Sequence, residues 1–242
     1  GFHAALAARA GARGDLSLLD QGHRRPGNSG SEVFAGLRAV LERPWVPGHG
    51  ISGAHFKQWA SAGQVAAAID AAGVLQDTHG FSAGDVTRVD VGVPAAYRRM
   101  IDQPAGAGRI WSLVSAQYQV AARLLHPQDL FDCARTVLRD SADFRRLMAV
   151  IHVHEEEALA PRHPASYPAR VEVTLRGGMT AAYLSAGRSP APHWDWEPLL
   201  VKARAVAASA AAGERISPLR AAVSGFTDSA GFLRSALPAA LR

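Results

Sequence analysis

Two short segments carry residue types suited to chemistry on an anionic substrate. The first contains Lys57, which lies a few residues before a predicted helix and just after residues 44–53, a stretch dense in Pro and Gly. A lysine at such a boundary can be held at a domain interface, and the nearby helix N-terminus adds positive potential. The pattern therefore suits a negatively charged ligand, although on the pattern alone a surface lysine is the favoured interpretation.

The second segment is VSAQYQVAARLL, in which Ser115 and Tyr118 fall one turn apart on the same face of a predicted helix. A tyrosine on a helix is more often part of the core than of a catalytic site, so the pair by itself predicts no function. The sequence has no P-loop, no GxGxxG after a strand, no HExxH and no GxSxG, and these motifs give no further indication.

A third pattern, His152-Val153-His154, places two imidazoles on one face of a predicted strand, where a two-histidine metal site is geometrically possible. No third ligand follows at a recognisable spacing. We therefore interpret the pair as a solvated strand edge and expect no metal.

Composition limits the kind of protein. The 242 residues are 48% hydrophobic and 19% charged, a balance typical of soluble globular domains, and no apolar run approaches the length of a membrane span. Of 26 Lys and Arg residues, only Lys57 and Lys202 are lysines, and the arginines are scattered without runs. This patterning indicates a coding bias and not a nucleic-acid binder. Cys133 is alone and no signal peptide is visible, so we expect a cytoplasmic protein.

Hydrophobic periodicity and turn residues predict an α+β protein whose two ends are helical. The predicted helices span residues 2–10, 31–41, 63–75, 112–125, 128–138, 196–208, 217–224 and 229–241. The predicted strands span residues 86–93, 147–154, 169–175 and 179–184, the last two forming a hairpin about Gly177-Gly178. We expect a partial helical domain over residues 1–52, an α+β domain over 53–188, and a return to the helical domain over 189–242.

Both candidate segments also carry a family resemblance. The run from Lys57 to Ala60 leads to Ile69-Asp70-Ala71, at the spacing of a family Lys-Pro-Tyr-Pro segment and its helix, and residues 114–121 are similar to a Phe-Ser-x-x-Tyr-x-Val-Ala helix. Residues 164–178 and 187–202 match a strand with a Gly turn and a return into helices. In this order the segments resemble the MmgE/PrpD family, which includes 2-methylcitrate dehydratase, cis-aconitate decarboxylase and iminodisuccinate epimerase.

The resemblance implies a fold and an activity. It implies an all-helical domain interrupted by an α+β lid, a homodimer, and a site that binds small polycarboxylates without a cofactor. Lys57 and Tyr118 match the family's active-site lysine and tyrosine, so we expect both to be catalytic and Lys57 and Ser115 to contact substrate. The expected reaction is proton abstraction next to a carboxylate, as in a 2-methylcitrate dehydratase-like lyase.

The resemblance leaves two alternatives open. It implies that about half of a family member, with further site residues, precedes Gly1, and that Ala66 stands where the family has a histidine. A truncated or degenerate, non-catalytic family member is the first alternative. An isomerase or epimerase that uses the same carbanion-type chemistry is the second.

Overall fold

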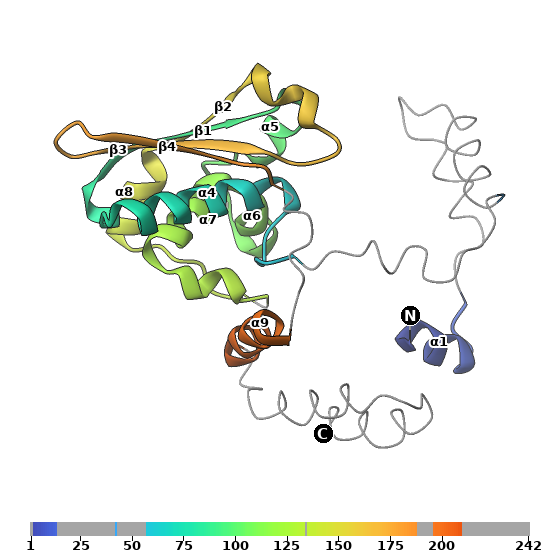
Figure 1. Cartoon of the computed structure of the whole chain (residues 1–242). Coiled ribbons are helices and arrows are strands. Elements are labelled where there is room, and N and C mark those ends of the chain that lie inside the picture. The colour runs from blue at the N-terminus through green and yellow to red at the C-terminus, as the bar shows by residue number, and fades with distance from the viewer. Residues whose placement is uncertain (1, 14–41, 43–56, 134, 188–195, 210–242) are drawn as a thin grey trace. The chain divides into compact units, whose positions relative to one another are not determined.

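The computed structural model describes residues 2–13, 42, 57–133, 135–187 and 196–209. The chain divides into two compact units, Gly1–Ala54 and His55–Arg242. The described residues of the first unit include the helix α1 (Phe2–Arg9), which agrees with the predicted helix over residues 2–10. The second unit holds all the remaining described helices and strands (Figure 1).

A four-stranded sheet organises the second unit. Its strands, in the spatial order β2-β1-β3-β4, are β2 (Ile151–Glu155), β1 (Val86–Val93), β3 (Ala169–Leu175) and β4 (Thr180–Ser185). β1 runs parallel to β2 and antiparallel to β3, and β3 and β4 form the predicted hairpin. Two of its turn residues, Gly177 and Gly178, have φ values of 99° and 85°, which favour glycine.

Helices cover one face of this sheet and form the core with it. α4 (Gly63–His79) packs against β3 and β4, and α7 (Ala116–Leu125) packs against α4 and β2 (Figure 1). The core contains apolar residues at helical spacing on α4 and the inward residues of the strands; they include Val65, Ile69, Ala72, Leu75, Val89, Val91, Val171 and Val173. α4 continues past the predicted end and stops at Gly80, whose φ of 64° is left-handed and whose N–H donates to the Gln76 carbonyl.

The prediction of one helix over residues 112–125 is wrong. The structure has two helices there, α6 (Gly108–Val114) and α7, separated at Ser115. Ser115 has an extended backbone and its Oγ accepts the Tyr118 N–H, 3.1 Å away, as the N-cap of α7. The serine therefore ends one helix and begins another, because its side chain competes for backbone groups that a continuous helix would use.

Of two neighbouring predictions, the first is also wrong and the second is correct only in part. Instead of a helix over residues 128–138, the structure has a short 3-10 helix, η2 (Pro127–Phe131), after which the Asp132 side chain accepts the Arg135 N–H. The strand predicted over residues 147–154 is present over its second half as β2, whereas residues 147–149 belong to the helix α8 (Ala142–Ala149). Ser141 caps α8 by accepting the Phe144 N–H, and the buried Phe144 and Leu147 lie one turn apart.

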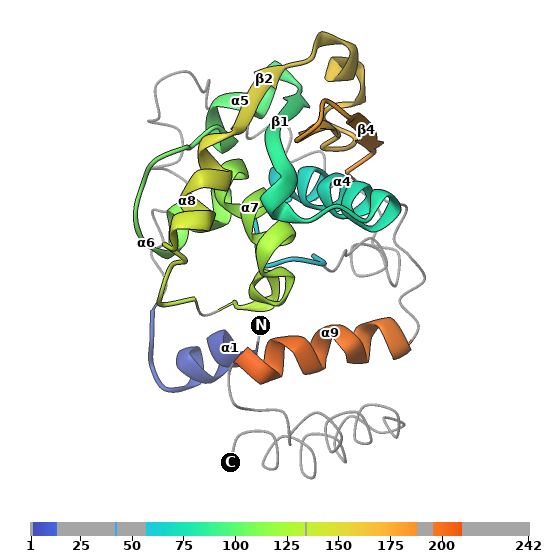
Figure 2. The same cartoon turned by 90° about the vertical axis from the view of Figure 1, so that its left-hand side faces the viewer.

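The other described helices complete the second unit. α5 (Ala95–Ile101) follows β1, and η1 (Ala83–Asp85) and η3 (Glu157–Arg162) are short 3-10 helices. α9 (Trp196–Ser209) agrees with the predicted helix over residues 196–208 and contacts η2; Figure 2 shows its length. The predicted helices over residues 31–41, 217–224 and 229–241 lie outside the described residues.

No helix in the described part of the chain is long and apolar enough to cross a membrane.

Candidate active site

Lys57 lies on a short irregular segment that is tied to its neighbours by several hydrogen bonds. The Ala60 N–H donates to the Leu130 carbonyl at 2.7 Å, and the Ala62 N–H donates to the Leu113 carbonyl at 2.8 Å. The Trp59 indole N–H donates to Asp70 Oδ1 at 2.7 Å. These bonds anchor the segment to η2, α6 and α4, so the position of Lys57 is set by the fold around it.

Beside this segment lies a pocket of about 270 Å³. We call it the Lys57 pocket; it is lined by residues 57–61, Arg109, Leu113, Phe131, Cys133, Lys202 and Val206. The Trp59 and Phe131 rings, with centroids 5.3 Å apart, supply an apolar wall. Its lining comes from the Lys57 segment, α6, the η2 region and α9, which are far apart in the sequence.

Three cationic side chains line the Lys57 pocket, and among the described residues no Asp or Glu lines it. Lys57 Nζ donates to the Ser61 carbonyl at 3.3 Å, and Lys202 Nζ donates to the Lys57 carbonyl. Burial lowers the pKa of Lys202, and interaction with Cys133 partly offsets this effect. Because the described lining carries three cationic side chains and no carboxylate, it is better suited to a small anion than to a cation.

Ser115 and Tyr118, the other two predicted site residues, are buried and do not line the Lys57 pocket. Ser115 Oγ donates to the Gln103 carbonyl at 2.8 Å and caps α7, as described above. Tyr118 is 1% exposed, and its ring packs against Trp111 and Phe144. The structure therefore brings Lys57 together with Lys202 but not with the Ser115–Tyr118 pair, whose predicted roles remain predictions.

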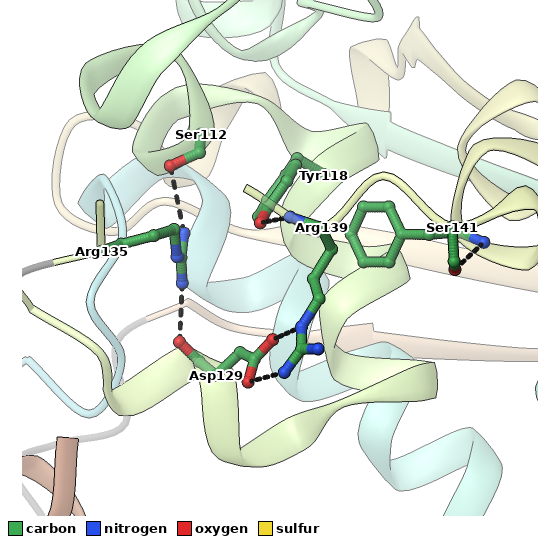
Figure 3. Close-up of polar contacts among 7 residues, drawn as sticks. Ser112, Tyr118, Asp129, Arg135, Arg139 and Ser141 are labelled. Atoms are coloured by element: carbon green, nitrogen blue, oxygen red, sulfur yellow. Dashed lines mark hydrogen bonds and ion pairs between the residues drawn. The ribbon is translucent and has the colours of Figure 1, made fainter. Parts of the chain in front are cut away.

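The Tyr118 ring and hydroxyl contact a network of arginines (Figure 3). The hydroxyl oxygen accepts the Arg139 backbone N–H at 3.0 Å, and the Arg135 guanidinium lies 5.2 Å from the ring centroid. Arg135 is 2% exposed and donates to Ser112 Oγ and to the Asp129 carbonyl. The Arg139 guanidinium pairs with both Asp129 carboxylate oxygens, at 2.6 and 3.0 Å.

A second cavity, of about 680 Å³, lies beside these arginines. Its lining includes Arg135 and Arg139 but also four aspartates, namely Asp129, Asp132, Asp140 and Asp143. Because the aspartates offset the arginines, this cavity is less suited to an anionic ligand than the Lys57 pocket is.

The two histidines on β2, His152 and His154, are both exposed and lie on one face of the strand, as predicted. In the register of the sheet His152 lies opposite Asp90. Among the residues that the structure describes, no group of three or more His, Cys, Asp or Glu side chains could hold a metal ion.

Sequence reasoning missed two arginines that contribute to these sites, Arg109 and Arg135. Neither residue stands out from the many scattered arginines of the sequence. The residues next to Arg109 give no indication that it lines a pocket. For Arg135 a weak signal exists, because Asp132 three residues earlier is well placed to accept its backbone N–H. Tertiary structure brings Arg109 to the Lys57 pocket.

Comparisons with known proteins are informative about the family and not about the site. A comparison with curated proteins gives no match. The model of the MmgE/PrpD C-terminal domain matches residues 59–222, which is more than half of the chain and includes the described sheet, its helices and most of the Lys57 pocket. The α+β architecture expected from the sequence is thus found together with the match to this domain, and the chain belongs to the MmgE/PrpD family.

Proposed function

We propose that this protein acts as an MmgE/PrpD-family lyase, similar to 2-methylcitrate dehydratase, on a small polycarboxylate. The observation that carries the proposal is the Lys57 pocket, a small volume in which Lys57, Lys202 and Arg109 meet without an acidic lining residue among those described. Its volume of about 270 Å³ lies near the lower end of ligand pockets and suits a small metabolite. Family membership supports the same substrate class.

The proposed chemistry explains why a lysine is needed. When a base removes the proton next to a carboxylate, negative charge builds up on the carboxylate oxygens, and a fixed cation stabilises it. The Lys57 ammonium supplies that cation, and a preorganised group of this kind contributes about 3 kcal/mol to the transition state. In this proposal other residues of the complete family site provide the base.

Tyr118 is proposed to donate a proton to a substrate oxygen or to the leaving group. Its oxygen accepts the Arg139 N–H, and within the described part of the chain no acceptor is bonded to its own hydroxyl proton. The hydroxyl can therefore act as a proton donor. Ser115 is proposed to contact the substrate beside it.

The experiment that tests the lyase is turnover with 2-methylcitrate and citrate, followed by the ultraviolet absorbance of the new carbon–carbon double bond. It is run on this chain and on any longer natural protein that contains it. Lys57→Gln is expected to lower kcat by about 100-fold, because it removes the charge and keeps most of the side chain. Arg99→Gln, which removes an exposed charge outside the pocket, is the control. Unchanged turnover in Lys57→Gln contradicts the proposal.

One observation favours a second candidate, a non-catalytic, carboxylate-binding family member. Tyr118 is buried and does not line the Lys57 pocket. Under this alternative the chain binds polycarboxylates through Lys57, and neither the chain nor a longer natural protein that contains it gives turnover. An isomerase or epimerase is distinguished by exchange of the substrate α-proton in deuterated water without formation of a double bond.

The remaining expectations belong to the same proposal. We propose a cytoplasmic homodimer that needs no cofactor and binds no nucleic acid. Sedimentation equilibrium tests the dimer. Titration with duplex DNA at several salt concentrations tests the last point, because a basic protein that binds DNA does so with a steep dependence on salt.

A further inference from the structure

The two edges of the described sheet differ in how they are protected against pairing with a further strand. β2 forms one edge and β4 the other (Figure 2). β2 exposes His152, His154 and Glu155, and charged or titratable side chains on an edge strand discourage such pairing. β4 has the sequence TAAYLS, with no charged residue, no proline and no break in its register with β3. The β4 edge therefore lacks the features that usually prevent a free edge strand from pairing.

The register of the hairpin determines which backbone groups of β4 point away from β3. The Leu175 N–H donates to the Met179 carbonyl at 2.8 Å beside the turn, and the pairing then continues residue by residue. Because hydrogen-bonded and non-hydrogen-bonded pairs alternate along an antiparallel ladder, the N–H and C=O of Tyr183 face β3, and those of Ala182 and Leu184 face outward. Among the described residues β4 has a neighbouring strand on one side only, so these outward groups are available to a further strand.

Large apolar side chains accompany this free edge on both faces of the sheet. Tyr183 is 42% exposed and Leu184 is 39% exposed. Tyr183 lies opposite the buried Val171 in the register, so its ring is on the face that the helices cover. Leu184, the next residue, is on the other face. A strand that paired with β4 would cover both side chains as well as the outward backbone groups.

We propose that β4 pairs antiparallel with β4 of a second copy of this chain, about a two-fold axis that passes through Tyr183. A two-fold axis perpendicular to the sheet sets each side chain opposite one on the same face, so it passes through a residue and not between two residues. At Tyr183 it opposes two aromatic rings in a non-hydrogen-bonded pair, where side chains lie closest, and sets Leu184 against Ala182 of the second copy. The outward groups of Ala182 and Leu184 then form four hydrogen bonds between the copies.

A second copy is the occupant that the strand itself favours. The two-fold pairs both free edges with each other, and the β2 edges with their charged and titratable side chains become the ends of one continuous sheet. Because β4 is uncharged, no like charges oppose each other across the axis. This pairing supplies the interface of the proposed homodimer, and in that respect it rests on the proposed function.

Sedimentation equilibrium of the intact chain tests the pairing. Ala182→Pro removes an N–H that points away from β3, and proline is tolerated at such positions of an edge strand. It removes two of the four hydrogen bonds between the copies, so the dissociation constant of the dimer is expected to rise by about 100-fold. Ala182→Thr keeps the N–H and has a side chain that favours strands, so as the matched control it is expected to dimerise within about threefold of wild type.

Disulfide formation tests the axis and does not depend on the folding of the proline variant. In a Cys133→Ser background, Tyr183→Cys is expected to become linked to its copy under mild oxidation, because the axis sets the two side chains opposite each other. Leu184→Cys lies opposite Ala182 of the second copy and is expected to stay largely unlinked.

The outcomes separate this interface from the rest of the proposed function. A dimer that is equally tight in wild type and in folded Ala182→Pro, or linkage of Tyr183→Cys no greater than that of Leu184→Cys, overturns the β4 interface and leaves the homodimer standing. A wild-type chain that sediments as a monomer overturns both the interface and the homodimer. Turnover in wild type and in Lys57→Gln decides the lyase independently of either result.

Discussion

The Trp59 indole N–H donates a 2.7 Å hydrogen bond to Oδ1 of Asp70, and this bond joins the segment that carries Lys57 to the helix that covers the sheet. Asp70 lies on α4, whose opposite side is buried in the core. The position of the pocket lysine therefore depends on a contact between Trp59, whose ring lines the pocket, and Asp70, which does not line it.

Replacing Trp59 with Phe is expected to weaken both folding and binding. The change removes the N–H and leaves a half-buried carboxylate without this donor, so the free energy of unfolding should fall by about 1–2 kcal/mol. Affinity for tricarballylate, a small polycarboxylate used here as a probe of the Lys57 pocket, should fall as well, because the Lys57 segment is held less firmly. Urea denaturation and calorimetric titration measure the two effects.

Trp111→Phe is the matched control, since it removes an indole donor that bonds the Gln103 carbonyl at 3.0 Å. It is expected to lower stability by a similar amount while tricarballylate affinity stays unchanged. Equal losses of affinity in both variants would show that the Trp59–Asp70 bond has no particular role at the pocket.

Asp70 itself supplies a pH-dependent prediction. Burial raises the pKa of its carboxyl above 3.8, and the Trp59 hydrogen bond and Arg123 partly oppose that shift. The folded state thus binds the proton more tightly than the unfolded state does, so the associated stability is present below pH 3.8 and is lost as the pH rises through the raised pKa. Above that pKa the ionised carboxylate destabilises the fold.

Asp70→Asn should remove this pH dependence, because the amide oxygen still accepts from Trp59 and carries no charge. Relative to wild type, the variant should become more stable as the pH rises from acid to neutral, because it avoids the cost of a buried charge. Urea denaturation at a series of pH values measures this difference. Asp77→Asn, at an exposed aspartate on the same helix, is the control. A difference that does not change with pH contradicts the prediction.

The parts of the fold that could be predicted from the sequence are those determined by local periodicity. The valines at alternate positions of β1 and the Gly177-Gly178 turn specify a strand and a hairpin without help from distant residues. The break at Ser115 could not be predicted in this way, because helix-forming residues lie on both sides of it. It depends on one hydroxyl that bonds the Gln103 carbonyl and the Tyr118 N–H, a competition that periodicity does not detect.

The candidate site shows the same division. Lys57 and Lys202 could be selected because lysine is so rare in this chain, and the structure places both at one pocket. Arg109 could not be predicted as a pocket residue, because it is one of many arginines in the sequence. Its orientation depends on hydrogen bonds to the Cys133 carbonyl, which lies far away in the sequence. When the role of a residue depends on a backbone atom that is distant in the sequence, the residues next to it do not predict that role.

The buried Arg135 is expected to be among the most sensitive positions for stability. Arg135→Met should lower the free energy of unfolding by about 3 kcal/mol, because Ser112 Oγ and the Asp129 carbonyl lose their donor and Tyr118 loses the cation over its ring. Thermal and urea denaturation provide the measurement. Arg145→Met, at an exposed arginine paired with Asp140, should change stability by no more than about 0.5 kcal/mol. A loss of similar size in both variants would mean that the Arg135 contacts contribute little.

Tyr118→Phe separates a catalytic tyrosine from a structural one. Loss of the hydroxyl leaves the Arg139 N–H without its acceptor, which should cost about 1 kcal/mol of stability in any case. If the phenol also donates a proton in the reaction, kcat should fall by about 100-fold while tricarballylate affinity at the Lys57 pocket is unchanged, since Tyr118 does not line it. Tyr97→Phe, which removes a hydroxyl bonded to the Pro168 carbonyl, should lower stability without affecting kcat. A Tyr118→Phe enzyme that is less stable but equally fast would assign this tyrosine to the core alone.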